Sequence, residues 1–326
     1  MAAVRVERVS SYKSVQCVVK DCSKCLVNRL RPILDVLISP NQSAFVPGRL
    51  ITDNALLAFE YFHFIQKNKN PGKAACAYKL DLSKAYDRVD WRFLEQEPLG
   101  FRTLFRTSML FSTATPVEVQ NSISNTLQLV NASLEDKYLG FPTPDGRMCK
   151  GKFLSLQERI WKRIMLWGEN FLSSGGKEMM FKSVIQAIPV YVMGVFKLPD
   201  SVCDDLNWLS RNFWWGAEKG KRKTNWKAWD CLTKPKQRGG LGFRDFKVFN
   251  QALLARQAWR LIDNPGSLCA RVLKAKNYPN GSLVDTCFSG CASPGWRSIE
   301  YGLELLKKGI IWRVGNGRSI RIWRNP

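Results

Sequence analysis

The chain has 326 residues, of which 45% are hydrophobic, and this length and composition predict a globular protein of two or three domains. Lys and Arg number 50 against 27 Asp and Glu, so the net charge is +23. A field of this sign favours a polyanionic partner, and RNA or DNA is the commonest one. Because there is no run of about 20 apolar residues and no secretory signal, we expect no membrane partner and a nuclear or cytoplasmic location. The composition does not indicate an oligomeric state.

The ten cysteines are scattered and, without a secretory context, are expected to be reduced. A closed zinc site needs four ligands, and Cys22 with Cys25 has the spacing of half a site, while Cys287 and Cys291 form a second close pair. We favour instead a shared helix face for Cys22 and Cys25, at positions i and i+3, and expect no zinc. The only histidine, His63, lies in an apolar helix and is interpreted as a core or rim residue.

The spacing of apolar residues predicts an α+β protein that is mainly helical. Pro32 is expected to kink or end the first helix, and Thr52 or Asp53 to N-cap the second. Gly175-Gly176 should interrupt the helical pattern, and Pro189 should end the helix before it. In chain order, we expect a frayed start over residues 1–16, helices over 17–37 and 52–67, a strand over 74–82, helices over 83–94, 153–171, 177–188, 200–215 and 250–262, a short strand and turn over 137–142, and a β-hairpin over 310–323.

The periodicity fades between residues 97 and 132. Pro98, Gly100 and Pro116 break the pattern, and a polar run over 121–125 follows. We therefore treat residues 97–133 as a junction.

Asp81 lies at the point where the predicted strand meets the predicted helix. An acid at the end of a strand can be presented rigidly into a cleft, and Tyr86 follows closely enough to face the same pocket. The alternative is an acid stabilised by the dipole at a helix N-terminus, and spacing alone leaves both interpretations open.

Residues 80–87, Leu-Asp-Leu-Ser-Lys-Ala-Tyr-Asp, resemble the first catalytic motif of reverse transcriptases from non-LTR (LINE-type) retrotransposons of the kind common in plant genomes. Residues 41–54 resemble the finger segment of the same family. The resemblance implies that Asp81 is a catalytic ligand of Mg²⁺ or Mn²⁺ and that Tyr86 packs under the incoming sugar. It also implies that Arg49 meets template or triphosphate, and that RNA and DNA are the partners.

The same family pairs its first-motif aspartate with two adjacent aspartates, and the resemblance places them before residue 138. From Pro98 to Gly140 the only acids are Glu118, Glu135 and Asp136, and the last two belong to a later region. We therefore expect that much of the palm is deleted, that residues 97–133 mark the join, and that the chain is also truncated at its C-terminus. A second acidic pair, residues 204–205, is interpreted as acids in the first turn of a helix.

The resemblance predicts a fingers and palm remnant over residues 17–96, a thumb-like helical region over 134–215, and a basic, Trp-rich region over 216–326 that ends in the hairpin. In the last region, basic residues interleave with aromatics, as in a backbone groove with stacking platforms. Lysine stems covering a buried tryptophan are the equally weighted alternative. The candidate nucleic-acid contacts are Lys219, Lys221, Arg222, Lys223 and Trp226.

Three functional hypotheses follow from these residues. The first is a protein related to RNA-directed DNA polymerases that is inactive because the paired aspartates are missing. The second is a nucleic-acid-binding protein without catalysis, and the third is a decayed retroelement product that folds poorly because lost palm strands expose sheet edges and apolar faces.

Overall fold

The computed structural model describes residues 18–39, 42–43, 46–70, 72, 74–82, 105–127, 137–144, 148–167, 172–218, 221–222, 224–286 and 292–311. The chain divides into two units, residues 1–54 and 55–326, and each is described by itself. The start over residues 1–16 and the predicted helix over 83–94 lie outside the described residues, as does the predicted C-terminal hairpin beyond Ile311.

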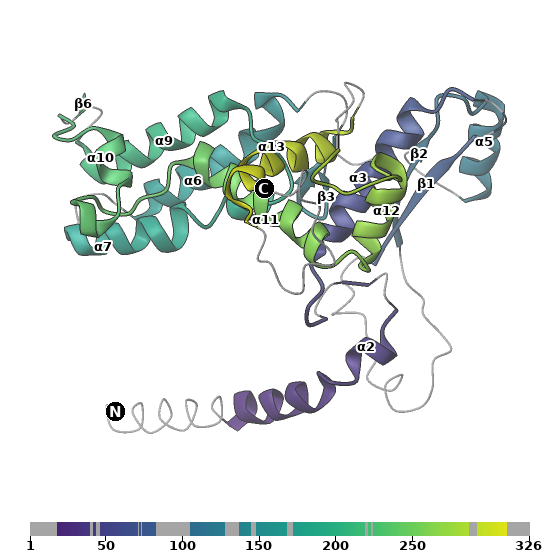
Figure 1. Ribbon diagram of the computed structural model, residues 1–326, viewed down its shortest axis with the longest axis horizontal. Helices are drawn as coiled ribbons and strands as arrows, with labels where there is room; N and C mark the ends of the chain where they lie inside the picture. Colours follow the sequence, from purple (N-terminus) through teal and green to yellow (C-terminus); the bar gives the residue numbers. More distant parts are fainter. Residues whose placement is uncertain are drawn as a thin grey trace, which may run out of the picture. The chain divides into compact units, whose positions relative to one another are not determined.

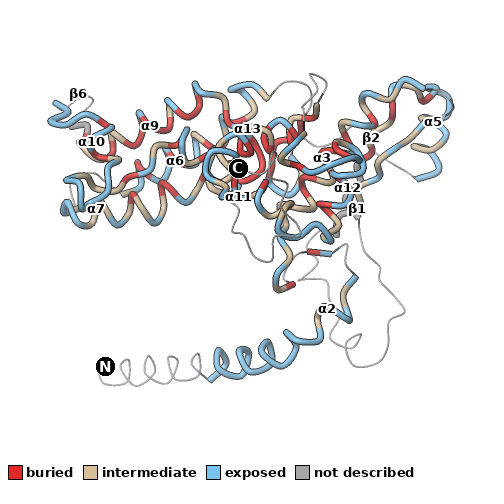
Figure 2. The backbone as a smooth tube through the Cα atoms, in the orientation of Figure 1, coloured by how far each residue is buried: buried red, intermediate tan, exposed pale blue. Residues whose placement is uncertain are grey.

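The first unit is built from short helices (Figure 1). Residues 18–30 are helical, and a turn over residues 31–33 separates them from α2 (Leu34–Leu37). The turn confirms that Pro32 ends the first helix, because proline lacks the N–H donor and its ring clashes with the preceding turn. Residues 18–30 are all exposed (Figure 2).

The helix α3 (Ile51–Lys67) ends where the pattern predicts but begins one residue before Thr52. The prediction that Thr52 or Asp53 is the N-cap is therefore wrong, because both residues already lie inside the first helical turn. There the Asp53 carboxylate is an acid in the first turn, where the helix dipole favours a negative charge.

The second unit is mostly helical, and its long helices follow the 3.6-residue periodicity of the sequence. Helix α11 (Phe246–Asp263) begins four residues before its predicted start, because Asp245 is its N-cap. The Asp245 Oδ1 accepts hydrogen bonds from the backbone N–H groups of Lys247 and Val248 at 2.9 and 3.1 Å. The elements are η3 (Lys150–Phe153), α6 (Leu154–Leu166), α9 (Asp200–Trp215), α10 (Trp229–Thr233), η6 (Lys236–Arg238), α11 (Phe246–Asp263), α12 (Leu268–Asn277) and α13 (Pro294–Gly309).

The helix predicted over residues 177–188 begins earlier and is irregular. It consists of α7 (Ser174–Met180) and the π-helical turn η5 (Phe181–Ile185), and α8 (Val190–Met193) follows Pro189. Gly175 and Gly176 therefore lie inside α7 instead of interrupting the helical pattern. The physical reason is an N-cap, since the Ser173 hydroxyl accepts a hydrogen bond from the Gly176 N–H at 3.2 Å.

Regular structure also forms where the sequence predicted a junction. Strand β1 (Cys76–Leu82) pairs antiparallel with β2 (Phe105–Phe111), and α5 (Val117–Thr126) follows (Figure 1). The fading periodicity of this segment did not reveal these elements. The polar run over residues 121–125 lies within α5. All residues of α5 are exposed or half-buried, so this helix has no apolar face in the core.

Two further hairpins are short. Strands β3 (Lys137–Tyr138) and β4 (Phe141–Pro142) confirm the predicted strand and turn. Leu139 and Gly140 have φ values of 50° and 80°, the positive values that a type I′ turn requires at both central positions. The other hairpin joins β5 (Ala217–Glu218) to β6 (Lys221–Arg222).

One hydrophobic core runs through the second unit and joins segments that are far apart in sequence. The Phe59 ring of α3 lies 6.0 Å from the Phe141 ring and 5.1 Å from the Phe196 ring, between centroids. At the crossing of α11 and α13, Gly302 is so close to the other backbone that a Cβ there would lie 2.2 Å from the carbonyl carbon of Leu254. The predicted palm-remnant helix α3 therefore shares its core with the predicted thumb-like region.

Candidate functional site

The first-motif aspartate lies on a two-stranded ribbon. Asp81 is the sixth residue of β1, which confirms that the strand reaches this position. In the antiparallel register, Asp81 is paired with Arg106, and its chain neighbours Leu80 and Leu82 are paired with Thr107 and Phe105. Directly opposed residues are the closest neighbours on one face of an antiparallel pair.

The residues of β2 do not fit a two-cation site. Such a site holds two divalent ions about 3.5–4 Å apart, and Mg²⁺ prefers oxygen ligands, chiefly carboxylates and water. Strand β2 reads Phe-Arg-Thr-Ser-Met-Leu-Phe and contains no acid, and an arginine stands at the position opposite Asp81. The described part of the ribbon supplies one carboxylate, which is not enough to hold two divalent metal ions.

Arg49, the candidate contact to template or triphosphate, is bound within its own unit. Its guanidinium donates hydrogen bonds to the backbone carbonyls of Ser39 at 2.6 Å, Gln42 at 2.7 Å and Ile38 at 3.3 Å. It also forms an ion pair with the Asp35 carboxylate at 3.1 Å. These bonds tie the loop after α2 together and engage both terminal nitrogens of the guanidinium.

The other acidic pair is structural. Asp204 and Asp205 lie in the second turn of α9, so the prediction that they are first-turn acids is wrong, and Asp200 occupies that position. The Asp205 carboxylate forms an ion pair with Lys150 at 2.6 Å and accepts a hydrogen bond from Gln157 at 2.8 Å. These contacts confirm that the pair belongs to a helix and not to a catalytic hairpin.

The candidate basic cluster lies on and beside the second short hairpin. Lys221 and Arg222 form β6, whereas Lys219 and Lys223 lie outside the described residues, as does Tyr86. Trp226 is 81% exposed and follows this hairpin directly.

The tryptophan three residues later behaves differently. Trp229 is only 8% exposed, and its ring lies 6.1 Å from the Phe181 ring. Trp226 is therefore exposed, whereas Trp229 belongs to the core.

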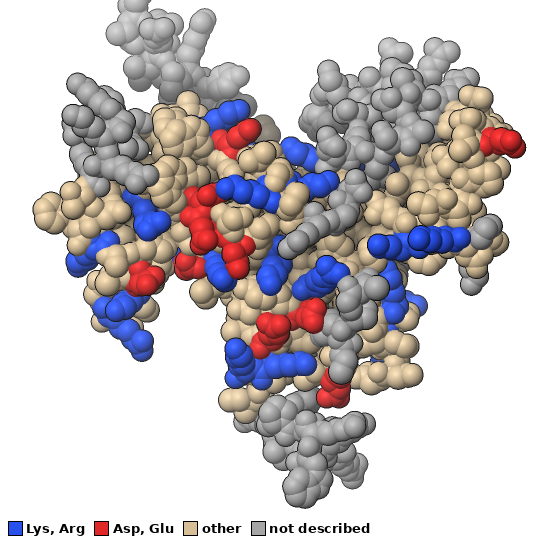
Figure 3. Space-filling view, turned by 90° about the horizontal axis from the view of Figure 1, so that it is seen from above, with Lys and Arg blue, Asp and Glu red and all other residues tan. Residues whose placement is uncertain are grey.

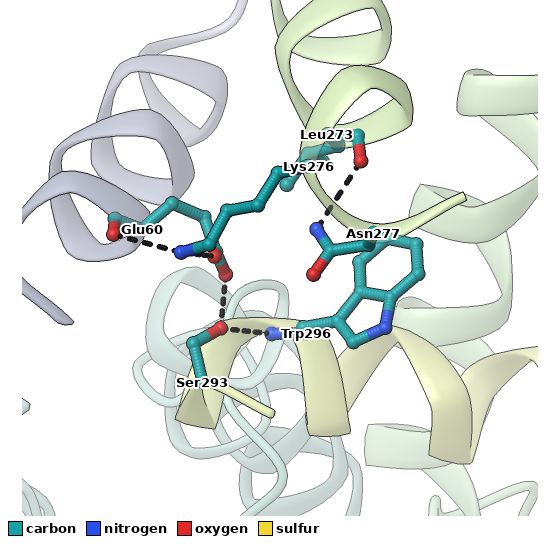
Figure 4. A network of polar contacts seen from close by, with 6 residues as sticks. All are labelled: Glu60, Leu273, Lys276, Asn277, Ser293 and Trp296. Carbon is teal, nitrogen blue, oxygen red and sulfur yellow. Dashed lines mark hydrogen bonds and ion pairs between the residues drawn. The ribbon is translucent and has the colours of Figure 1, made fainter. Parts of the chain in front are cut away.

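A buried polar network, which the sequence did not reveal, joins α3, α12 and the start of α13 (Figure 4). The Glu60 carboxylate is 3% exposed and forms an ion pair with Lys276 at 2.8 Å. Lys276 also donates to the Glu60 backbone carbonyl at 3.1 Å, and the Ser293 hydroxyl bonds the other carboxylate oxygen while capping α13 at the Trp296 N–H. The available signal was an acid among apolar residues in the middle of the helix.

His63 lies one helical turn after Glu60 and is half-buried, which confirms the prediction of a rim residue. Burial lowers the pKa of His63, and the positive charges of Lys276, Lys67 and Arg297 lower it further, while Glu60 acts in the opposite direction.

Charge is mixed on the surface. On the face drawn in Figure 3, Lys and Arg side chains are widely spread and Asp and Glu side chains lie among them. Within the described ranges, no helix combines the length and apolar composition needed to span a bilayer. Three or more Cys, His, Asp or Glu side chains do not converge into a metal-binding group among these residues.

Cys22 and Cys25 lie one turn apart in the helix over residues 18–30, as predicted, and both are exposed free thiols. Cys287 and Cys291 lie outside the described residues.

Comparison with known proteins places the chain in a family. Residues 7–138 match the family model for reverse transcriptase (RNA-dependent DNA polymerase). The chain is 41% identical over 138 residues to "Uncharacterized mitochondrial protein AtMg00310" of Arabidopsis thaliana, covering 42% of this chain and 90% of that protein. It is 36% identical over 186 residues to "Putative ribonuclease H protein At1g65750" of the same plant, covering 56% of this chain and 30% of the relative.

A third relative is "Transposon TX1 uncharacterized 149 kDa protein" of Xenopus laevis, which is 39% identical over 75 residues, or 23% of this chain and 6% of that protein. The matched family segment contains the strand with Asp81 and the helix α3. The chain thus belongs to the reverse transcriptase family of plant retrotransposons.

Proposed function

We propose that this reverse-transcriptase-related chain binds RNA or DNA and does not extend primers. The observation that carries the loss of catalysis is the register of the β1–β2 ribbon, which places Arg106 opposite Asp81. Nucleotidyl transfer by two cations needs several carboxylates around the metal pair, and β2, the strand paired with the Asp81 strand, contains no acid. Mg²⁺ or Mn²⁺ would bind weakly at Asp81 and would not form the pair.

The primer-extension assay tests this part of the proposal. The full chain, incubated with a primed RNA template, deoxynucleotides and Mg²⁺ or Mn²⁺, is expected to give no extended primer. Template-dependent synthesis that disappears in Asp81→Ala would overturn the loss of catalysis, because it would show that this carboxylate still works in a metal site.

Binding of nucleic acid is supported by the net charge of +23 and by the exposed aromatic group beside a basic hairpin. A basic groove that follows the phosphate backbone, with aromatic platforms for bases, is the usual arrangement in single-strand binding. We assign Lys221, Arg222 and Trp226 to this contact, with Lys219 and Lys223 as neighbours in sequence.

Fluorescence anisotropy with a labelled single-stranded oligonucleotide tests the contact. The logarithm of the association constant should fall with log salt, with a slope of about −0.7 for each phosphate contacted. Trp226→Ala should weaken binding by about 1–3 kcal/mol if a base stacks on the ring. The matched control is Trp208→Ala in α9, whose side chain is 40% exposed. Binding that is absent, insensitive to salt, or equally affected by the two variants would contradict the proposal.

The continuous core of the second unit favours a folded nucleic-acid-binding protein over a decayed product that folds poorly. A cooperative thermal unfolding transition is the expected result, because one core that includes α3, α9, α11 and α13 should unfold together. A broad transition without a folded baseline would favour the decayed product.

A further inference from the structure

Three helices that meet at Glu60 carry the single histidine and several basic residues. On α3, Glu60, His63 and Lys67 are spaced by three and four residues, so they share one helix face. Helix α12 contributes Lys276, whose ammonium lies 2.8 Å from the Glu60 carboxylate. Helix α13 contributes Arg297, one turn after Ser293, which bonds the same carboxylate. The charges of both lysines, Arg297 and Glu60 act on His63.

The charges of this cluster are unbalanced. Lys67, Lys276 and Arg297 are three cations, and Glu60 is the one acid among the charged groups that act on His63. Glu60 is 3% exposed and is engaged by Lys276 and by the Ser293 hydroxyl, so its charge is held on the inner side. Lys67 and Arg297 are exposed, and His63 is half-buried between the core and the surface. The outer side of the cluster therefore carries two exposed cations, with Glu300 one turn beyond Arg297 on α13.

We propose that His63, Lys67 and Arg297, together with Lys276, form a binding site for a phosphodiester group of RNA or DNA. This site rests on the proposed nucleic-acid-binding function and adds a second contact, separate in sequence from the basic hairpin. Guanidinium, ammonium and imidazole groups all donate hydrogen bonds to phosphate oxygens, and such charge-assisted bonds are stronger than neutral ones. Because His63 is half-buried, its interaction with a bound anion is screened less by salt than that of an isolated surface lysine.

Occupancy of the site should change the protonation of His63. In the free protein, burial and the neighbouring cations lower the pKa of His63, so the imidazole is neutral at pH 7. A bound phosphodiester brings a negative charge that opposes these cations, so the pKa of His63 rises in the complex. Binding then takes up a proton and becomes tighter as the pH falls through the pKa of the complex. A rise of about one pKa unit corresponds to about tenfold tighter binding at low pH.

The chain contains one histidine, so a single NMR signal reports on the site. The full chain, labelled with ¹³C at the histidine ring, is titrated with pH in three states: alone, with a thymidine-homopolymer DNA, and with inorganic phosphate at the same phosphate concentration. We expect the pKa of His63 to rise with the DNA and to rise less with inorganic phosphate. A shift with inorganic phosphate and none with DNA would show a site for the free anion and overturn the proposal.

Matched charge variants complete the test. Lys67→Gln and Lys308→Gln each remove one lysine charge from the last turn of a helix, α3 and α13 respectively. We expect Lys67→Gln to weaken DNA binding several-fold and to reduce the shift of the His63 signal, whereas Lys308→Gln leaves the shift unchanged. Circular dichroism of both variants confirms that they fold.

The outcomes of the two proposals are distinguishable. If the DNA binds and the pKa of His63 does not move, the phosphodiester site is wrong and the proposed function stands. If the DNA does not bind at all, both fail.

Discussion

Replacing Lys276 with methionine removes the cation that pairs with Glu60 while keeping a long apolar side chain. The Glu60 carboxylate is 3% exposed and the Lys276 side chain is 34% exposed. Breaking a fully buried ion pair by removing one partner costs about 3–5 kcal/mol, and a hydrogen bond to a charged group contributes about 1.5–3 kcal/mol. Because Lys276 is partly solvated and Ser293 still bonds Glu60, we expect a loss of about 2 kcal/mol in the free energy of unfolding.

Guanidinium chloride unfolding, followed by tryptophan fluorescence, measures this loss. The matched control is Lys150→Met, which breaks the ion pair with Asp205 at 2.6 Å, where the two side chains are 50% and 40% exposed. An exposed pair contributes about 0.5 kcal/mol or less. The double variant Glu60→Gln/Lys276→Met removes the unpaired charge and should recover part of the stability. Equal losses in the two lysine variants, or no recovery in the double variant, would refute the reasoning that burial of Glu60 sets the cost.

Four further outcomes are expected. Gly302→Ala should destabilise the chain by about 2 kcal/mol in the same unfolding assay, because the new Cβ would meet the backbone of α11 at 2.2 Å, a clash that outweighs the better helix propensity of alanine. A Cβ at Gly175 in α7 would meet no atom within 4 Å, so Gly175→Ala should be neutral or stabilising by up to about 1 kcal/mol. A similar loss of stability in the Gly302 and Gly175 variants would contradict the close contact between α11 and α13.

Burial, reinforced by the charges of nearby aspartates, raises the pKa of the Cys203 thiol to about 12. At pH 9 a thiol reagent should therefore modify the exposed Cys231 of the folded chain and spare Cys203. In the unfolded chain the Cys203 thiol ionises near pH 8.5. The stability that the buried thiol contributes is therefore present below that pH and is lost as the pH rises toward 12. In a Cys203→Ala variant, the free energy of unfolding should depend less on pH over this range.

Much of the helical structure could be predicted from local patterns. Leu156, Ile160 and Ile164 recur every four residues and form the buried face of α6, and α9 has the bounds that its periodicity predicts. The two glycines of α7 were misjudged because the Ser173 cap offsets their weak helix propensity. Strand β2 was missed because Phe105–Phe111 has no clear alternation and becomes a strand only through pairing with β1.

The sequence by itself determined the family, the strand that carries Asp81, the positions of the main helices and the excess of positive charge. These properties depend on residue identity and on spacings of two to four positions, which the chain shows directly. The tertiary structure alone decided that Arg106 stands opposite Asp81 and that Lys276 and Ser293 enclose Glu60. Those pairs join residues up to 233 positions apart, and only packing of the whole core selects which distant residues meet.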